Sequence, residues 1–276
     1  MIRTTFVLAM AAFVSTTAAA QTPLERGTYL MSSIVACGNC HTQNTPQGPM
    51  PGMELAGGTK FQEGFGISYA SNITPDPETG IGKWTDAQII TAIREGKRPD
   101  GSIIGPPMPI ELYHGLSDDD VKAIVAYLRS VTPVVNKVAK AEYKVPLPPS
   151  YGPPVTTVAA VPRTDLVKYG AYLAGPAGHC IECHSKPDAR GVPDFKNELG
   201  AGGVSFNGPW GTSYAPNITP TGIGKWSDDD IKKAITTGVR PDGTRLKPPM
   251  AYGYYKNISA EDLNALVAYL RTLPPK

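Results

Sequence analysis

Two short clusters of cysteine and histidine stand out in this chain, CGNCH at residues 37–41 and CIECH at residues 180–184. A C-x-x-C-H pattern is typical of covalent c-type haem attachment. Two thiols at this spacing can add to the two vinyl groups of haem, and the adjacent histidine can then reach the iron. The pattern predicts two covalent haem c groups, attached through Cys37, Cys40, Cys180 and Cys183, with His41 and His184 as iron ligands.

Two other kinds of site use closely spaced cysteines. A thiol–disulfide redox pair belongs in a βαβ context, and no such pattern surrounds either cluster. A zinc site would pool the four cysteines, but each pair has its own histidine in its own part of the chain. Covalent haem attachment therefore explains the two clusters better than either alternative.

The sixth iron position needs a second ligand. Met108 and Met250 each follow two prolines, at matching places beyond the two clusters. A thioether is a soft ligand, and His/Met ligation raises the haem potential. A repeated methionine can also be core filler, but a Pro-Pro-Met loop outside any helix is an unusual core element. We expect Met108 and Met250 to bind the two irons.

Other residues are weaker candidates for the haem sites. His114 has a lysine as its counterpart in the second half, and His179 lies directly before a cysteine, so we expect neither to bind iron. One set of residues recurs in both halves and either lines the haem pockets or packs as ordinary buried residues: Tyr69, Asn72 and Trp84, with Tyr214, Asn217 and Trp226.

The chain is an internal duplication. SYASNITP at residues 68–75 recurs as SYAPNITP at 213–220, and RPDG at 98–101 recurs at 240–243. The period is far longer than that of a solenoid repeat, so two copies of a compact domain fit better. We expect a first domain at 21–133, a proline-rich linker at 134–164 that crosses the surface, and a second domain at 165–276.

The regular patterns within each copy are helical. Thr85 and Ser227 each precede a helix-like segment that ends at a glycine. Residues 117–130 begin with Ser-Asp-Asp-Asp and carry apolar residues at i, i+3, i+4 and i+7. No convincing strand-like alternation is present, and long loops rich in glycine and proline join the helices. The expected fold is all-α, with each domain wrapped around one covalent haem.

Composition and the first residues bear on the class of protein. The chain has 26 basic and 24 acidic residues, which argues against nucleic-acid binding. Residues 1–20 have the positive, apolar and small-residue parts of a secretory signal peptide, with cleavage expected after Ala20. No later apolar run reaches the length of a membrane span. We expect an exported, periplasmic protein without a transmembrane anchor in the mature chain.

Several segments resemble one family. GTYL before the first cluster, SYASNITPD, TGIGKW and LSDDDVKAIVAYLRS are similar to the cytochrome c subunits of bacterial periplasmic and membrane-bound dehydrogenases, such as those for alcohols and gluconate. The resemblance covers most of 23–134 and 164–275. It implies an all-α cytochrome c fold in each domain and the axial pairs His41/Met108 and His184/Met250.

The resemblance also implies a role in electron transfer. A periplasmic dehydrogenase would be the electron donor, and a cytochrome or a terminal oxidase of the respiratory chain would be the acceptor. Familiar members have three haem domains and a C-terminal membrane-associated helix. This chain has two haem clusters, so a soluble subunit or shuttle is expected.

An enzyme is the alternative. A dihaem peroxidase needs one haem whose iron can release a ligand and bind substrate. Its other haem usually has a histidine ligand in place of methionine, whereas both copies here offer methionine. A thiosulfate dehydrogenase uses a cysteine as an axial ligand, and the chain has no fifth cysteine. We therefore expect no catalytic residues, and an electron-transfer protein rather than an enzyme.

Overall fold

A computed structural model of the chain describes residues 21–276 except 46–47, 189–190 and 209. The expected signal peptide and its cleavage site after Ala20 lie outside or at the edge of the described residues. The helices of the first half are α1 (Pro23–Ser32), α2 (Gly38–His41), α3 (Asp86–Glu95), α4 (Ile110–Tyr113) and α5 (Asp118–Ser130).

The second half repeats this order with two additions, a π-helix and a short α8. Its helices are α6 (Leu166–Tyr172), the π-helix η1 (Leu173–Ala177), α7 (Cys180–His184), α8 (Pro220–Ile223), α9 (Asp228–Thr237), α10 (Tyr252–Tyr255) and α11 (Ala260–Thr272). Within the described residues, no helix is both long enough and apolar enough to cross a membrane.

The expectation of an all-α fold was incomplete, because short strands occur in the loops. They are β1 (Asn44–Thr45), β2 (Gly48–Pro49), β3 (Lys60–Glu63), β4 (Gly66–Tyr69), β5 (Glu142–Tyr143), β6 (Ser205–Gly208) and β7 (Gly211–Tyr214). All pairings are antiparallel, in the orders β1-β2, β3-β4-β5 and β6-β7. Strands of two to four residues are too short to show a convincing alternating pattern in a sequence.

The predicted helix starts and stops are confirmed. Thr85 caps α3 through a reciprocal capping box with Gln88, and Ser227 does the same for α9 with Asp230. Both helices end at a glycine in the left-handed conformation, where a residue without a Cβ is favoured: Gly96 and Gly238, with φ of 63° and 69°.

The first and last helices of each half cross at very short range. Helix α1 packs on α5, and α6 packs on α11. A Cβ at Gly27 would lie 2.0 Å from the carbonyl oxygen of Ala123, and a Cβ at Gly170 would lie 1.9 Å from that of Ala265. Both crossings therefore require glycine, which explains why GTYL and GAYL recur before the two haem clusters.

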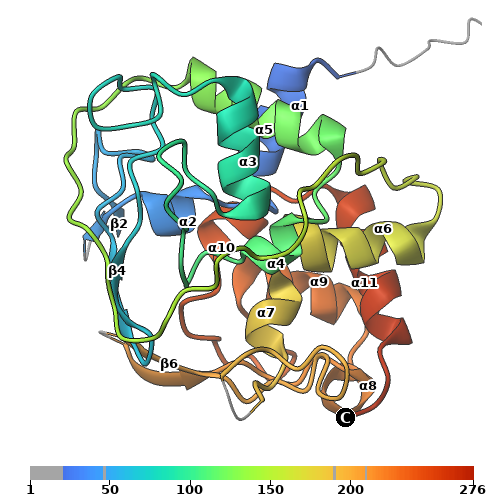
Figure 1. The fold of residues 1–276 in the computed structure, drawn as a ribbon. Helices are drawn as coiled ribbons and strands as arrows, with labels where there is room; N and C mark the ends of the chain where they lie inside the picture. Colours follow the sequence, from blue (N-terminus) through green and yellow to red (C-terminus); the bar gives the residue numbers. More distant parts are fainter. Residues whose placement is uncertain (1–20, 46–47, 189–190, 209) are drawn as a thin grey trace, which may run out of the picture.

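The two halves share one hydrophobic core. A single cluster of buried side chains includes Leu30, Ile34 and Ile124 of the first half together with Leu173 and Leu266 of the second. In Figure 1, α1, α3 and α5 lie together at the top, while α6, α9 and α11 lie together at the lower right. The halves thus pack firmly on each other.

Each haem cluster lies beside the other half. Nδ2 of Asn39 in α2 donates to the carbonyl of Pro249, 3.4 Å away and just before α10. The ring of Tyr113 in α4 makes an edge contact with the ring of His179, just before α7, with centroids 6.0 Å apart. Figure 1 shows these four short helices together near the middle of the molecule.

The segment 134–164 runs along the first half. Strand β5 within it adds to the β3-β4 hairpin. Further on, the hydroxyl of Tyr151 donates to the carbonyl of Ile104 at 2.8 Å, and the carbonyl of Val158 accepts from the amide of Asp118 at 2.9 Å. These contacts hold the proline-rich segment on the surface of the first half.

Candidate haem sites

The two cluster histidines have the same hydrogen-bonded orientation. Nδ1 of His41 donates to the carbonyl of Ser71 at 2.7 Å, and Nδ1 of His184 donates to the carbonyl of Pro216 at 2.8 Å. The proton is therefore on Nδ1, and Nε2 keeps a lone pair that can bind a metal. Burial lowers the pKa of both imidazoles, which favours the neutral form that a metal ligand requires.

The backbone around each cluster is built in the same way. Ala36 and His179, directly before the two clusters, both adopt positive φ, 47° and 40°. After each cluster the histidine carbonyl accepts from a glycine amide, Gly57 at 2.7 Å and Gly202 at 2.8 Å. A non-glycine residue with positive φ carries strain that often marks a functional site, so the chain folds both clusters at a local energetic cost.

The four cysteines are half-buried free thiols. Burial raises the pKa of Cys37 to about 12 and that of Cys40 to about 11. Burial likewise raises the pKa of Cys180 to about 11, and that of Cys183 even further. Thiols whose pKa is raised by burial do not suit a site that depends on thiolate charge.

A zinc site is not formed by these residues. Across the part of the chain that the structure describes, no group of three or more His, Cys, Asp or Glu side chains could hold a metal ion. Within these residues, the two cysteine pairs therefore do not pool into one such group.

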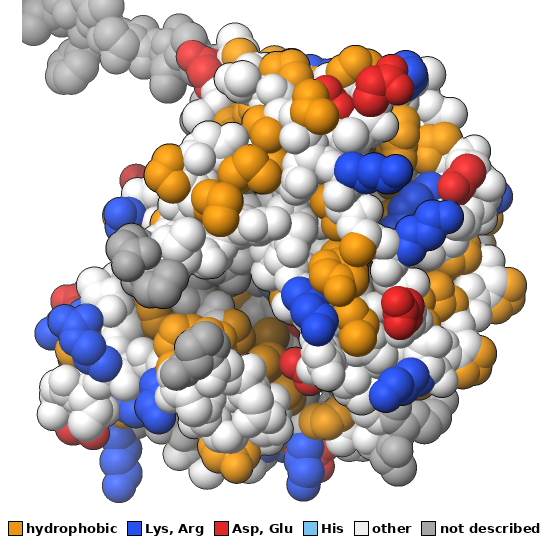
Figure 2. Space-filling view, turned by 90° about the vertical axis from the view of Figure 1, so that its left-hand side faces the viewer, with side chains coloured by type: hydrophobic (Ala, Val, Ile, Leu, Met, Phe, Trp, Pro, Cys, Tyr) orange, Lys and Arg blue, Asp and Glu red, His pale blue; other side chains and the backbone are white. Residues whose placement is uncertain are grey.

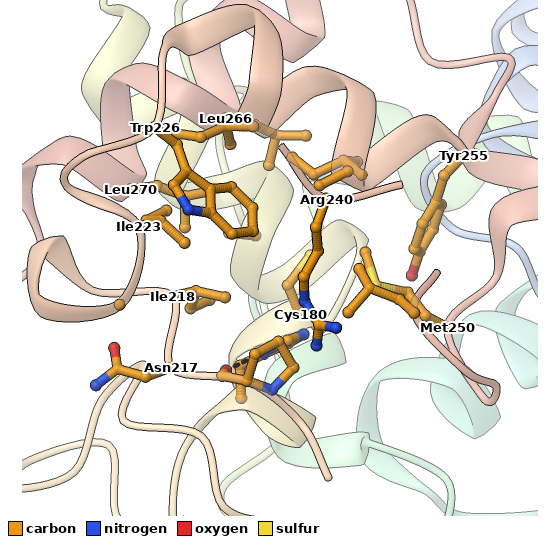
Figure 3. Close-up of a pocket in the computed structure, with 18 of the residues that line it drawn as sticks. Cys180, Asn217, Ile218, Ile223, Trp226, Arg240, Met250, Tyr255, Leu266 and Leu270 are labelled. Carbon is orange, nitrogen blue, oxygen red and sulfur yellow. Dashed lines mark hydrogen bonds between the residues drawn. The ribbon is translucent and has the colours of Figure 1, made fainter. Parts of the chain in front are cut away.

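The structure places three of the predicted site residues of the second half around one cavity. Cys180, His184 and Met250 all line a cavity of about 280 Å³. The rest of the lining is mostly apolar, with Trp226 and several isoleucines and leucines (Figure 3). Figure 2 shows a hollow with hydrophobic side chains on the face where β2, β4 and β6 lie in Figure 1. An apolar cavity with a thiol, an imidazole and a thioether fits a c-type haem.

The methionine loops are also equivalent in the two halves. The carbonyl of Met108 accepts from the amide of Ile110 at 2.9 Å, and the carbonyl of Met250 accepts from the amide of Tyr252 at 3.0 Å. Both methionine side chains are partly buried against the shared core. The loops are thus anchored at the starts of α4 and α10.

The sequence left open whether Asn72 and Asn217 pack as ordinary buried residues or contact a haem. In the structure, both asparagine side chains have hydrogen-bond partners. Oδ1 of Asn72 accepts from the amide and hydroxyl of Thr74, and Oδ1 of Asn217 does the same with Thr219. These bonds hold the NITP turns, although Asn217 also lines the cavity. The side chain of Tyr214 points away from the core, since the residue is 67% exposed.

The two weaker histidine candidates have partners of their own. Nδ1 of His114 donates to the carbonyl of Ile110 at 3.0 Å, within one turn of chain. Nδ1 of His179 lies 3.4 Å from a carboxylate oxygen of Glu182. Neither contact resembles the Nδ1 bonds of the two cluster histidines to the loops at Ser71 and Pro216.

Two lining residues were not anticipated from the sequence. Ile34 belongs to the first half but lines the cavity of the second. Arg240 also lines this cavity, and its only sequence signal was the recurrence of RPDG in both halves. Local sequence patterns predict neither the direction of the Arg240 side chain nor the contact of Ile34 with the cavity of the other half.

The cytochrome c family model matches the chain twice, at residues 25–132 and 167–274. These matches cover most of the chain and contain both clusters. The chain belongs to the cytochrome c family, and its two cytochrome c domains provide for two c-type haems.

Known relatives agree with this assignment. The chain is 31% identical to a diheme cytochrome c-type protein of Cereibacter sphaeroides, over 86% of this chain and 82% of the relative. It is 30% identical to the cytochrome c subunit of a quinone-dependent alcohol dehydrogenase of Gluconacetobacter polyoxogenes, over 99% of this chain and 62% of that subunit. It is 33% identical to a fructose dehydrogenase cytochrome subunit of Gluconobacter japonicus, over 95% of this chain and 55% of that subunit. The chain thus spans about 62% and 55% of these two dehydrogenase subunits.

Proposed function

We propose that this chain is a two-haem electron carrier, with one haem held by residues 21–133 and one by residues 165–276. The haem supplies reversible one-electron chemistry at its iron. The residues that hold the two groups are Cys37, Cys40, His41 and Met108 in the first domain, and Cys180, Cys183, His184 and Met250 in the second. The observation that carries this proposal is the cavity that Cys180, His184 and Met250 line together.

The chain's own residues favour electron transfer over catalysis. Each domain offers a histidine and a methionine as iron ligands. Nδ1 of the histidine donates to a backbone carbonyl, and a backbone hydrogen bond anchors the loop of the methionine. The apolar lining excludes water, which limits the rearrangement of charge when an electron arrives. A peroxidase or a thiosulfate dehydrogenase is not favoured, because a substrate would need an open iron position.

The arrangement of the domains supports electron passage within the chain. The two haem clusters face short helices of the opposite domain, and Tyr113 and Tyr255 are buried there. Burial raises the pKa of both tyrosines, and cysteines contribute to the rise, including Cys40 of the opposite domain for Tyr255. Asn39 and His179, inside or directly before the two clusters, each contact the opposite domain, and we propose that an electron passes between the domains at this interface.

The names of the relatives point to the partners. We propose that a periplasmic dehydrogenase donates electrons to this chain, and that a cytochrome or a terminal oxidase accepts them. The support is the similarity to the cytochrome c subunits of alcohol and fructose dehydrogenases. Export to the periplasm, with cleavage after Ala20, rests on the leader-like residues 1–20.

Carbon monoxide distinguishes a carrier from an enzyme, because it binds reduced haem iron at an open or labile position. The purified, exported protein is reduced and its optical spectrum is recorded before and after the gas is added. We expect no change in the wild-type spectrum. Met108→Ala is the matched control, and it should open one position and shift part of the absorption. A shift in the wild type would favour the enzyme and contradict the carrier.

A further inference from the structure

The loop before Met108 lies under the segment 134–164 that joins the two domains. Two tyrosines of that segment, Tyr143 and Tyr151, reach this loop. The hydroxyl of Tyr151 donates to the carbonyl of Ile104 at 2.8 Å. In Figure 1 the segment runs beside β4 on its way from α5 to α6. The joining segment therefore holds the methionine loop of the first domain by a direct hydrogen bond.

Tyr143 contacts the same loop closer to the methionine. A Cβ at Gly105 would lie 2.5 Å from Cζ of Tyr143, so the tyrosine ring lies directly on that glycine. The tyrosine hydroxyl donates to the carbonyl of Pro106 at 3.4 Å and lies 3.3 Å from the hydroxyl oxygen of Ser68 in β4. Tyr143 is itself held in place, because β5 pairs with β4. Its side chain therefore joins the methionine loop to the β3-β4-β5 sheet.

The second domain builds the corresponding place without a residue of the joining segment. Oγ of Ser213 donates directly to the carbonyl of Pro248 at 2.6 Å. In the duplication, the counterparts of these two residues are Ser68 and Pro106. In the first domain, the hydroxyl of Tyr143 stands between the serine hydroxyl and the proline carbonyl. The two methionine loops are therefore attached to their domains in different ways.

The two methionine loops also differ in exposure. Residues 103–106 are buried or half-buried, whereas their counterparts at 245–248 are exposed except for Leu246. The counterpart of Gly105 is Lys247. A lysine in place of Gly105 would collide with the ring of Tyr143, while the long side chain of Lys247 is exposed. Glycine thus occupies the position where the joining segment packs on the loop.

We propose that Tyr143 and Tyr151 are positioning residues for Met108, and that Met250 is therefore the methionine that an external ligand displaces first. This inference rests on the proposed function, since it requires a methionine-ligated haem in each domain. A methionine leaves its iron only when its loop moves. Movement of the first loop must also break the contacts with the two tyrosines, and local opening costs more free energy where more contacts are lost.

Titration of the oxidised protein with imidazole tests this order of displacement. Imidazole at high concentration competes with a soft thioether for oxidised iron. Its binding removes the weak near-infrared band that arises from sulfur bound to that iron. Met250→His leaves a sulfur ligand only on the first haem, and Met108→His leaves one only on the second, so each haem is titrated by itself. We expect imidazole to bind the second haem about fivefold more tightly than the first, as one additional neutral hydrogen bond would give.

Removing the two tyrosine hydroxyls should abolish this difference. In the Met250→His protein, Tyr143→Phe and Tyr151→Phe together should raise the imidazole affinity of the first haem about fivefold, because both rings remain and only the hydrogen bonds are lost. In the Met108→His protein, the same two substitutions should leave the second haem unchanged. Tyr214→Phe is the matched control, since Tyr214 is 67% exposed, and it should change neither haem.

Hydrogen–deuterium exchange of the wild-type protein gives a second readout that needs no substitution. Relative to the unfolded peptides, residues 245–250 should be less protected than residues 103–108. The proposal is overturned if the two loops are equally protected, if the two haems bind imidazole equally, or if the tyrosine substitutions change both haems or neither.

The covalent haem count and the sulfur band separate this inference from the proposed function. Fewer than two haems on the wild type, or no sulfur band in either methionine variant, contradicts the proposed function. Two haems and two sulfur bands with equal imidazole affinities contradict only the role of the two tyrosines.

Discussion

The hydroxyl of Tyr29, in the first domain, donates a hydrogen bond of 2.7 Å to Oδ2 of Asp262 in the second. Tyr172 and Asp120 make the same contact with the domains exchanged, at 2.6 Å. Each bond joins the first long helix of one domain to the last helix of the other. The duplicated sequence therefore forms an interface in which equivalent residues meet twice, as they do about a two-fold axis.

The surroundings of the two carboxylates are not identical. Arg26 holds Asp120 with two bonds, of 2.8 Å from Nε and 3.0 Å from Nη2. Among the described residues, the ionic partner of Asp262 is Arg163, at 3.6 Å, and Oδ1 of Asp262 is buried without a hydrogen bond. The bond from Tyr29 therefore matters more to Asp262 than the bond from Tyr172 does to Asp120.

Removing these hydroxyls should weaken the domain interface. Hydrogen bonds to charged groups contribute about 1.5 to 3 kcal/mol. We expect Tyr29→Phe to lower the free energy of unfolding by about that amount, and Tyr172→Phe by less because Arg26 still pairs Asp120. Guanidinium denaturation of the haem-loaded protein measures both. Tyr214→Phe is the control, since Tyr214 is 67% exposed. Equal losses in all three variants would contradict the interface role.

The close crossing of α6 and α11 predicts intolerance at Gly170. A Cβ there would lie 1.9 Å from a backbone oxygen, so Gly170→Ala must push the helices apart. Overpacking of this kind costs about 1 to 3 kcal/mol. Gly253→Ala is the control, because no atom lies within 4 Å of the added Cβ. Thermal unfolding should show a clear loss for the first variant and none for the second. The helix-crossing argument fails if Gly170→Ala is as stable as the wild type.

The turn after NITP predicts a pH dependence. Asp76 accepts from the hydroxyl of Thr79 at 2.7 Å and from its amide at 2.6 Å, and these bonds lower the pKa of Asp76 from its ordinary value of 3.8. A lowered pKa in the folded state stabilises the protein above pH 3.8, and this contribution is lost as the pH falls through the folded-state value.

Substitution of Asp76 tests this dependence. Asp76→Asn should reduce stability at pH 7 and flatten the loss between about pH 4 and pH 2. Asp119→Asn, which removes an exposed carboxylate of α5, is the control. Denaturation midpoints measured across that range should separate the two variants. Identical profiles for Asp76→Asn and the wild type would remove Asp76 from the groups that respond to acid.

The proposed methionine ligands, Met108 and Met250, predict separable effects on the two haems. His/Met ligation gives a higher potential than ligation by two histidines. Met108→His should therefore lower one midpoint potential, and Met250→His the other. Each should also remove half of the weak near-infrared band that arises from sulfur bound to oxidised iron. Met53→Leu is the control. Potentials and a band unchanged in Met108→His would exclude Met108 as a ligand.

Helix α5 shows how much of the fold the sequence could predict. Ser117 caps it as expected, and the apolar residues of its predicted face, Val121, Ile124, Val125 and Leu128, are all buried. Caps and helical periodicity are local properties, so one sequence is enough to reveal them. The β3-β4 and β6-β7 hairpins escaped prediction, because each strand has only four residues in a glycine-rich loop.

The candidate site also has a part that local sequence patterns predict and a part that they do not. The proposed cysteine and histidine ligands were inferred from residue spacing, and the proposed methionine ligands from their matching places in the duplication. Tyr29 and Asp262 are 233 residues apart, and their pairing depends on how the domains dock. The direction of Arg240 into the cavity likewise depends on how its loop folds back on the domain. Such relationships have no local signal and become visible only in the structure.

The most direct test of a two-haem carrier is the number of electrons that one chain takes up and returns. Anaerobic coulometric titration of the purified, exported protein measures this number, with the optical spectrum recorded at each step. We predict two electrons per chain, with the same spectra on reduction and on reoxidation. Uptake of one electron, or uptake that cannot be reversed, would contradict the account.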